Sequence, residues 1–224
     1  MTDRIPKSST YLNPTFLLFL LLNLTVLGQE NTFTEEVHTI TENYDSVWDE
    51  SKETIVFTGS SSIRLWKNLE ESFPQHQIIN TGFGGSQASD LLYHIDDLVI
   101  RYLPSKVFIY EGDNDIFSKK RPNKIILTTE QIIQRIWYHK NDAQIVLISA
   151  KPSISRWKLR GRYKRLNRKL ERLSRTNPLL TFVDVWNPML NGRKPKKEIF
   201  ISDGLHMNQK GYDIWFNTMK HLVE

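Results

Sequence analysis

The stretch VFTGSSSIRLW, residues 56–66, places three consecutive serines where an apolar run ends and a helical pattern begins. Val56 and Phe57 favour a β-strand, and the helical pattern starts at Ile63. A serine at such a junction can cap the helix, or it can be a nucleophile. We expect Ser62 to cap this helix, and the local pattern leaves Ser61 open to either role.

Composition sets limits on the class of protein. A chain of 224 residues with 39% hydrophobic content can bury one sizeable core, which indicates a single domain. The absence of cysteine excludes disulfides, thiol catalysis and cysteine metal sites. The formal net charge of +5 is modest, and without a nucleic-acid-binding motif it does not predict nucleic acid as a partner.

The N-terminus, residues 1–28, has the features of a secretory signal peptide. Two cations precede the apolar run FLLFLLLNLTVLG, residues 16–28. The run is shorter than the roughly 20 residues that a membrane-spanning helix needs, and Asn23 interrupts it. We therefore predict cleavage near Gly28 and an exported protein, periplasmic or secreted. The alternative is an N-terminal membrane anchor that is not cleaved.

Strand and helix patterns alternate through the rest of the chain. Short apolar, β-branched runs at 54–58, 77–80, 106–110, 143–149 and 180–185 predict five strands buried on both faces. Helical stretches are expected near 62–72, 86–98, 128–140, 157–175 and 208–223. This alternation predicts a flavodoxin-like, doubly wound α/β/α domain with a five-stranded parallel sheet over residues 53–224, after a helix-and-loop lead-in at 29–52.

Polar loops follow most of the predicted strands. Such sheets bind ligands outside the carboxyl ends of their strands. Residues 59–62, 81–86 and 111–115 follow the first three strands, and residues 202–212 precede the last helix. They are rich in glycine, hydroxyl, amide, carboxylate and imidazole groups. We expect these four loops to share one edge of the sheet.

These loops contain the groups that activate a serine. A serine hydroxyl needs a base, commonly a histidine that a carboxylate orients. Asp203 and His206 are three residues apart, so one helical turn places them on the same face. The reaction also needs donors for an oxyanion. Glycines allow close backbone approach, and Asn114 carries an amide donor.

The four loops resemble the four sequence blocks of the SGNH hydrolases, also called GDSL-like esterases and lipases. The matching stretches are GSSS (59–62), NTGFGGS (80–86), GDND (112–115) and DGLH (203–206). The resemblance spans about residues 53–222 and is closest to the subgroup that resembles platelet-activating-factor acetylhydrolases. Ser60 stands where many members have aspartate.

The resemblance implies a serine esterase that needs no metal and no cofactor. It implies Ser61 as the nucleophile, with Asp203 and His206 completing the triad. The oxyanion donors would be the backbone N–H groups of Ser61 and Gly85 and the side chain of Asn114, with Gly84 as the alternative to Gly85. The substrate would be a small-molecule or polysaccharide ester.

Other interpretations stay open. Asp113, Asp115 and His206 could serve a metal-dependent phosphoesterase, although we expect Asp115 to stabilise its loop. Asp203 and Asn208 could cap the last helix. The fold could also carry an inactive protein that binds a carbohydrate or another surface. The sequence sets no oligomeric state.

The acyl preference depends on the apolar residues of the loops. They contribute few large apolar side chains, chiefly Phe83, Ile116, Phe117, Leu205 and Met207. This favours short acyl groups, with acetyl groups on a carbohydrate as the expected substrate, over the long chains of a lysophospholipase or lipase, which need a sizeable apolar pocket.

The segment 156–175 contains ten Lys or Arg and one Glu. Its apolar residues recur at steps of three and four, which predicts a helix with one core-facing stripe. The cations on the other side are either a solvated face or a contact for an anionic polymer or membrane surface.

Overall fold

The computed structural model describes residues 33–224. The predicted signal peptide, 1–28, and the start of the lead-in lie outside the described residues, so both stay predictions. Contacts divide the chain into two units, residues 1–36 and 37–224. The described part of the first unit contributes only the beginning of helix α2 (Thr34–Asp45). No helix within residues 33–224 has the length and apolarity that crossing a bilayer requires.

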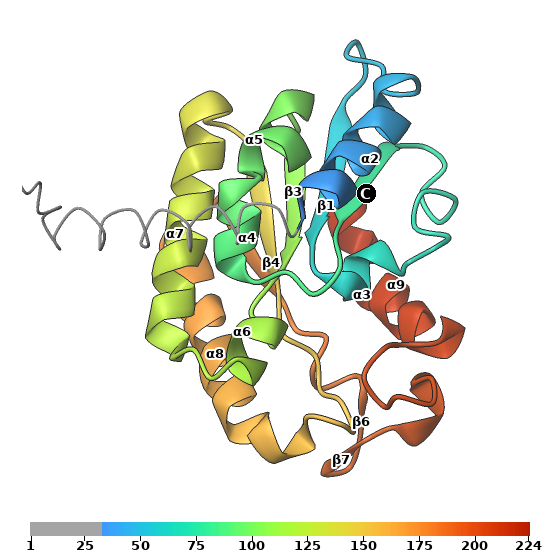
Figure 1. Ribbon diagram of the computed structural model, residues 1–224, viewed down its shortest axis with the longest axis vertical. Helices are drawn as coiled ribbons and strands as arrows, with labels where there is room; N and C mark the ends of the chain where they lie inside the picture. The colour runs from blue at the N-terminus through green and yellow to red at the C-terminus, as the bar shows by residue number, and fades with distance from the viewer. Residues whose placement is uncertain (1–32) are drawn as a thin grey trace, which may run out of the picture. The chain divides into compact units, whose positions relative to one another are not determined.

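The second unit is built on a parallel sheet with the strand order β2-β1-β3-β4-β5 (Figure 1). Its strands are β1 (Thr54–Gly59), β2 (Gln77–Gly82), β3 (Lys106–Tyr110), β4 (Gln144–Ile148) and β5 (Leu180–Val183). This order and the parallel pairing confirm the predicted flavodoxin-like arrangement. The strand order reverses between β1 and β3, and a crevice for ligands is expected there.

Helices connect the strands. They are α3 (Ser61–Arg64), α4 (Ala88–Tyr93), α5 (Ile95–Leu98), α6 (Asp113–Phe117), α7 (Pro122–His139), α8 (Arg160–Ser174) and α9 (Gln209–Val223). Short 3-10 turns are η1 (Ile100–Tyr102), η2 (Trp157–Leu159) and η3 (Lys197–Ile199), and β6 (Leu190–Asn191) pairs with β7 (Lys194–Pro195) in a small hairpin.

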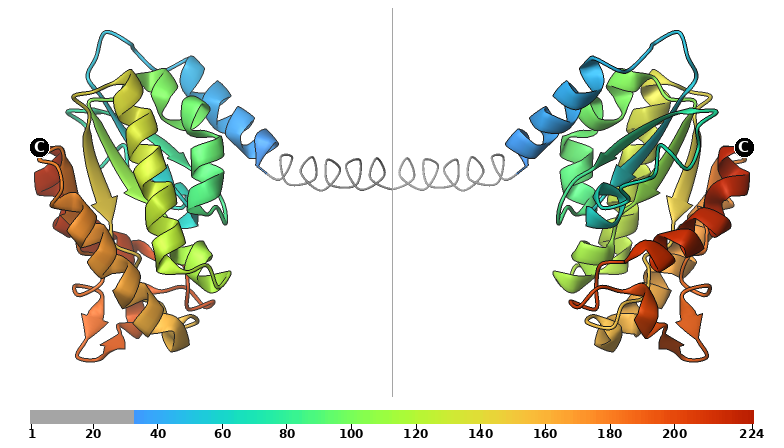
Figure 2. Two further views of the ribbon diagram at one scale, coloured as in Figure 1. Left: turned by 90° about the vertical axis from the view of Figure 1, so that its left-hand side faces the viewer. Right: turned by 90° about the vertical axis from the view of Figure 1, so that its right-hand side faces the viewer.

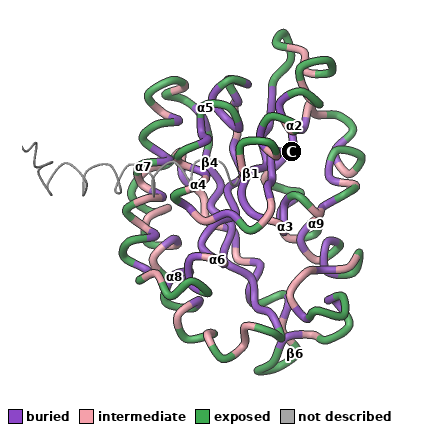
Figure 3. The backbone as a smooth tube through the Cα atoms, in the orientation of Figure 1, coloured by how far each residue is buried: buried purple, intermediate pink, exposed green. Residues whose placement is uncertain are grey.

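The helices cover both faces of the sheet. Figure 2 shows α9 on one side of the strands and α7 on the other. On the α9 face, Phe57 stacks on Phe108 with ring centroids 4.2 Å apart, and Trp66 packs against Trp215. Ile55 and Phe57 both belong to the core on this face. Because side chains alternate along a strand, Val56 between them points to the opposite face. Figure 3 shows that the strands are buried, whereas the outer sides of the helices are exposed.

The predicted helix at 62–72 is wrong beyond Arg64, where α3 ends. Leu69 and Phe73 are buried, but they lie on successive turns closed by three-residue backbone hydrogen bonds. Such turns bury side chains three or four residues apart, as an α-helix does. The spacing of apolar residues in the sequence therefore could not distinguish successive turns from a helix. The single helix predicted at 86–98 is also wrong, since the chain forms two helices there, α4 and α5, which meet at His94. The remaining helices differ mainly at their ends. For example, α7 begins six residues early because Pro122 occupies its first turn, where proline fits well.

Candidate active site

The end of β1 brings the first serine block to the place between β1 and β3 at which the strand order reverses. Gly59 has φ +120°, and a Cβ built there would lie 2.0 Å from the carbonyl oxygen of Tyr110 on β3. Only glycine permits this close approach without strain. The backbone N–H of Ser60 donates to the same carbonyl at 3.1 Å. The chain therefore turns sharply, and α3 starts at Ser61.

The expectation that Ser62 caps this helix is wrong. Ser60 occupies the N-cap position, without a side-chain capping bond, and Ser62 lies inside α3. Ser60 and Ser62 are buried, whereas Ser61 is partly exposed. The contact of Gly59 with Tyr110 ends β1 at Gly59. Ser60 therefore becomes the N-cap of α3, and Ser61 becomes its first residue. Ser61 is thus the serine of the three that solvent reaches.

Ser61, His206 and Asp203 form a chain of short contacts. Ser61 Oγ lies 3.1 Å from His206 Nε2, and His206 Nδ1 lies 2.6 Å from Asp203 Oδ2. The other oxygen of Asp203 accepts the backbone N–H groups of Leu205 and His206 at 2.8 and 2.9 Å. With the carboxylate on Nδ1, the tautomer with a proton on Nδ1 is favoured, and Nε2 is then free to accept the serine proton.

Asp203 stays ionised in this arrangement. Burial raises its pKa, but the hydrogen bonds from Leu205 N–H and from the side chain and N–H of His206 outweigh burial and lower the pKa to about 2. A carboxylate can stabilise a neighbouring imidazolium only when it carries its charge. The loop therefore carries both a candidate base and an ionised group that contacts its ring.

The loop that carries these residues is closed on itself. Ile201 N–H donates to His206 C=O, and Gly204 N–H donates to Ile201 C=O, both at 3.0 Å. Gly204 C=O in turn accepts the N–H groups of Ile154 and Ser155 after β4. Asn208, rather than Asp203, caps α9 by accepting from Gly211 N–H. These bonds fix the histidine position before any substrate arrives.

The second and third blocks meet through Asn114. Its Nδ2 donates to the carbonyl of Ser86 at 2.9 Å, which places the amide beside the GFGGS loop. Gly85 has φ +77° and open space around its Cα. A Cβ on Gly84 would lie 2.9 Å from the Arg64 guanidinium carbon. The choice between Gly84 and Gly85 as donor stays a prediction.

Sequence reasoning missed a buried charge cluster next to Asn114. Arg156 Nη1 lies 2.6 Å from Asp113 Oδ1, and Lys151 Nζ lies 3.5 Å from Asp113 Oδ2. Burial raises the pKa of Asp113, but Lys151 and Arg156 outweigh burial and lower it. Both cations follow β4, and no functional loop was predicted after that strand. A lysine directly after a buried strand was the available signal.

The geometry argues against the metal-dependent alternative. Asp113 accepts from Arg156, Lys151 and the hydroxyls of Tyr110 and Tyr163. Asp115 accepts from Ala88 N–H and pairs with Lys120 at 3.3 Å, which agrees with a loop-stabilising role. The carboxylate oxygens that a metal ion would need as ligands therefore accept from protein donors instead. In the part of the chain that the structure describes, no three His, Asp or Glu side chains gather as metal ligands.

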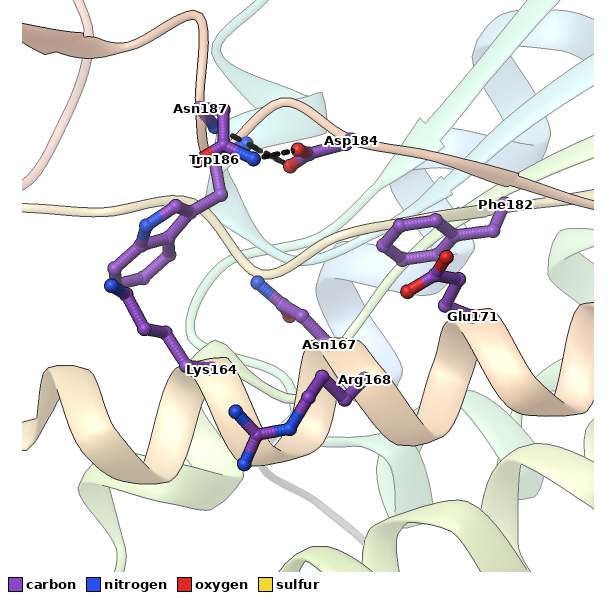
Figure 4. A pocket seen from close by; sticks show the side chains of 8 residues that line it. All are labelled: Lys164, Asn167, Arg168, Glu171, Phe182, Asp184, Trp186 and Asn187. Atoms are coloured by element: carbon purple, nitrogen blue, oxygen red, sulfur yellow. Dashed lines mark hydrogen bonds between the residues drawn. The ribbon is translucent and has the colours of Figure 1, made fainter.

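A hollow of about 230 Å³ lies between α8 and the chain after β5 (Figure 4). None of the candidate catalytic residues lines it. Asn167, on its wall, exchanges two hydrogen bonds with the backbone of Ala150, and Asp184 accepts from Asn187 and from Trp186 N–H. These hydrogen bonds join α8 to the chain after β4 and stabilise the turn after β5. The hollow is therefore part of the structural framework and is not the candidate ester site.

The strand order, the serine at the end of β1 and the aspartate–histidine loop define an SGNH-type hydrolase fold. Residues 40–214 match the model of the GDSL-like lipase/acylhydrolase family, and the chain belongs to that family. No curated protein matches the chain.

Solved structures share the fold at low sequence identity. A Streptococcus pneumonia protein provisionally described as a platelet activating factor is 24% identical, with a TM-score of 0.75, covering 90% of this chain and 99% of that one. A GDSL-like lipase from Bacteroides thetaiotaomicron is 20% identical, with a TM-score of 0.70 and coverage of 82% and 96%. A variant of an acetyl-xylooligosaccharide esterase from Geobacillus Stearmophilus is 16% identical, with a TM-score of 0.63 and coverage of 75% and 93%.

Proposed function

We propose that the protein is an exported serine esterase that hydrolyses carboxylic esters through an acyl-enzyme on Ser61. The observation that carries the proposal is the continuous contact from Ser61 Oγ through the His206 ring to Asp203. A serine that merely capped α3 would not need a histidine on its hydroxyl. An inactive binding protein would have no reason to retain that contact either.

The first half of the reaction forms the acyl-enzyme. Ser61 Oγ attacks the ester carbonyl carbon while His206 Nε2 takes the hydroxyl proton, and the carbonyl oxygen becomes an oxyanion. When the intermediate collapses, the bond to the leaving oxygen breaks, and the alcohol takes the proton from Nε2. Water then attacks the acyl-enzyme, Nε2 removes its proton, and Ser61 leaves with that proton as the acid is released.

The oxyanion would be held by the N–H groups of Ser61 and Gly85 and by the amide of Asn114. Ser61 is the first residue of α3, so its N–H has no partner within the helix. Asn114 Nδ2 has two hydrogens, and the bond to Ser86 uses one of them. The second hydrogen is the one we assign to the oxyanion.

We propose that the preferred substrates carry short acyl groups, acetyl above all, on a carbohydrate. Of the five large apolar side chains in the motif loops, Phe83, Ile116 and Met207 are buried in the protein and do not line an acyl site. Phe117 remains exposed and Leu205 is half-buried, and Ile154 and Ile201 add exposed apolar surface beside the Asp203–His206 loop. Four separate side chains can cover a short acyl group but do not enclose a long one.

A nitrophenyl ester series from two to sixteen carbons tests this preference. The full chain should show its highest kcat/KM at two to four carbons, and a panel of acetylated glycans should release acetate. A maximum at eight carbons or longer would contradict the short-acyl proposal and support a lysophospholipase or lipase. No hydrolysis of any ester would support the inactive binding protein.

The exposed side of α8 suggests the kind of molecule that carries the ester. This face and the turn before it expose Lys158, Arg160, Lys164, Arg165, Arg168 and Arg172. We propose that the polysaccharide substrate is itself anionic, since clustered cations raise the local concentration of an anionic polymer. Replacing Arg165 and Arg168 with glutamate reverses the charge of this face. The double variant should have a lower kcat/KM on an acidic acetylated glycan at low salt but not at high salt, and its kcat/KM on a neutral acetylated glycan should not change. Equal effects on both glycans, or binding to anionic vesicles instead, would contradict this.

The proposed export rests on residues 1–28 and is tested separately. The mature protein recovered from the periplasm or medium should begin near Gln29. A full-length chain retained in the membrane fraction would favour the uncleaved anchor.

A further inference from the structure

The Asn114 amide is held at both of its ends. Nδ2 donates to the carbonyl of Ser86 at 2.9 Å, and Oδ1 accepts from Arg156 Nη1 at 3.0 Å. The oxygen and nitrogen of an asparagine amide have nearly the same size, so only hydrogen bonds decide which way the amide faces. Ser86 and Arg156 together select one of its two orientations.

Arg156 is itself held firmly in place. The same Nη1 atom donates to Asp113 Oδ1 at 2.6 Å, and the guanidinium carbon lies 4.3 Å from the centroid of the Phe117 ring. Only 11% of its side chain is exposed. Guanidinium hydrogens lie in one plane at fixed angles, so a clamped arginine presents a donor at a defined position. Asp113, Asn114 and Phe117 all belong to α6, which ties Arg156 to the helix that carries the oxyanion donor.

We propose that Arg156 is a positioning residue that fixes the Asn114 amide with its NH2 group toward the oxyanion. The proposal rests on the proposed esterase function. With Oδ1 held by Arg156 and one N–H held by Ser86, the planar amide leaves its second N–H in a single direction. If the amide turned over, its oxygen would face the oxyanion and repel it.

The buried Asp113 carboxylate is also linked to the Asp203–His206 loop, through Lys151. Lys151 Nζ lies 3.5 Å from Asp113 Oδ2 and donates to the Leu205 carbonyl at 2.9 Å. Leu205 lies between Asp203 and His206. Asp113 thus holds both Arg156, which contacts Asn114, and Lys151, which contacts the loop that carries His206. The oxyanion donor and the catalytic base are far apart in the sequence, and this one carboxylate links their positions. Such supporting contacts hold reacting groups within the narrow tolerance that catalysis needs.

A double-mutant cycle between Arg156 and Asn114 tests the proposal. Arg156→Met should lower kcat on nitrophenyl acetate by roughly tenfold or more, up to the factor of about 10² to 10³ that loss of one donor costs. KM should change by less than about twofold, because the oxyanion forms only in the transition state. In an Asn114→Ala background, the same Arg156 substitution should have almost no further effect. Arg135→Met removes an exposed arginine of α7 that pairs with the exposed Asp96; it is the matched control and should leave kcat unchanged in both backgrounds.

The outcomes separate a positioning role from other roles. An equal loss in both backgrounds would show that Arg156 acts independently of Asn114, and a rise in KM alone would make it a substrate contact. Either result, or an unchanged rate, overturns the proposal. If Arg156→Met does not fold by circular dichroism, Arg156→Lys replaces it, since lysine keeps a charge beside Asp113. Its smaller loss in kcat must still vanish with Asn114→Ala. Full activity of Ser61→Ala would instead mean that the esterase mechanism itself is wrong.

Discussion

Ser61 Oγ and His206 Nε2 lie 3.1 Å apart although 145 residues separate them in the chain. Two rigid features create this contact. The close approach of Gly59 to Tyr110 sets the position of Ser61, and the closed loop from Ile201 to His206 sets the position of the base. The acceptor for the serine proton is therefore in place without substrate, as a preorganised general base requires.

Replacing Asn114 with alanine should lower kcat for ester hydrolysis by about 10² to 10³, the usual loss for one oxyanion donor. KM should change little, because the charge that Asn114 would bind develops in the transition state. Steady-state kinetics on a short nitrophenyl ester measure both constants. A change confined to KM would make Asn114 a group that binds the ground-state substrate.

Replacing Gly59 with alanine should destabilise the fold by about 2 to 4 kcal/mol, since it combines an unfavourable φ with an overlap against a backbone carbonyl. Gly161→Ala is the matched control, because a Cβ at Gly161 meets nothing within 4 Å and the residue lies in helix α8. It should be neutral or stabilising by up to about 1 kcal/mol. Urea unfolding followed by circular dichroism compares the two. Equal stability of both variants would show that β1 can move away from β3 at little cost.

The sequence predicted the sheet and the aspartate–histidine pair because both depend on local pattern. Buried parallel strands need continuous apolar runs such as Val107 to Tyr110, and these runs stand out against their neighbours. Asp203 and His206 need only one turn to meet, so their spacing was sufficient. The boundaries of α3 were less predictable, since the end of β1 is set by a contact with another strand.

The surroundings of Asn114 could not be predicted in the same way. Arg156 begins a segment with ten cations, and such a segment indicates a solvated face. Its burial depends on Asp113, which lies 43 residues earlier and whose carboxylate it pairs with. Lys151 is buried for the same reason. Long-range ion pairs leave no periodicity in the sequence, and only the position after β4 hinted at them.

Buried Glu111 gives a prediction for pH. Burial raises the pKa of this carboxyl group well above its usual value, although the hydroxyl of Ser86 donates to it at 2.7 Å. As the pH rises above about 4.3, the usual pKa of an unfolded glutamate, the unfolded chain loses this proton while the folded chain keeps it. Because the folded state then binds one more proton than the unfolded state, the contribution of Glu111 to the free energy of unfolding falls as the pH rises. The fall ends once the pH exceeds the raised pKa of Glu111 in the folded protein.

Glu111→Gln removes this dependence and preserves an oxygen that can accept from Ser86. The free energy of unfolding of the variant, relative to the natural chain, should increase as the pH is raised from 4 to 8. Urea unfolding at several pH values measures the difference, and Glu50→Gln serves as a control because that side chain is exposed. A difference that stays constant or decreases with pH would mean that Glu111 is ionised in the folded protein.

The central claim is that Ser61 is the nucleophile, and covalent labelling with a fluorophosphonate tests it most directly. The natural chain should gain one adduct, located on Ser61 by mass spectrometry of its peptides, and should lose ester hydrolysis in step with labelling. Ser61→Ala should take up no label and hydrolyse no ester, whereas Ser62→Ala, a substitution at the buried neighbour, should do both. His206→Ala should label far more slowly. Labelling of Ser61→Ala at the natural rate, or ester hydrolysis by that variant at the natural rate, would contradict the account.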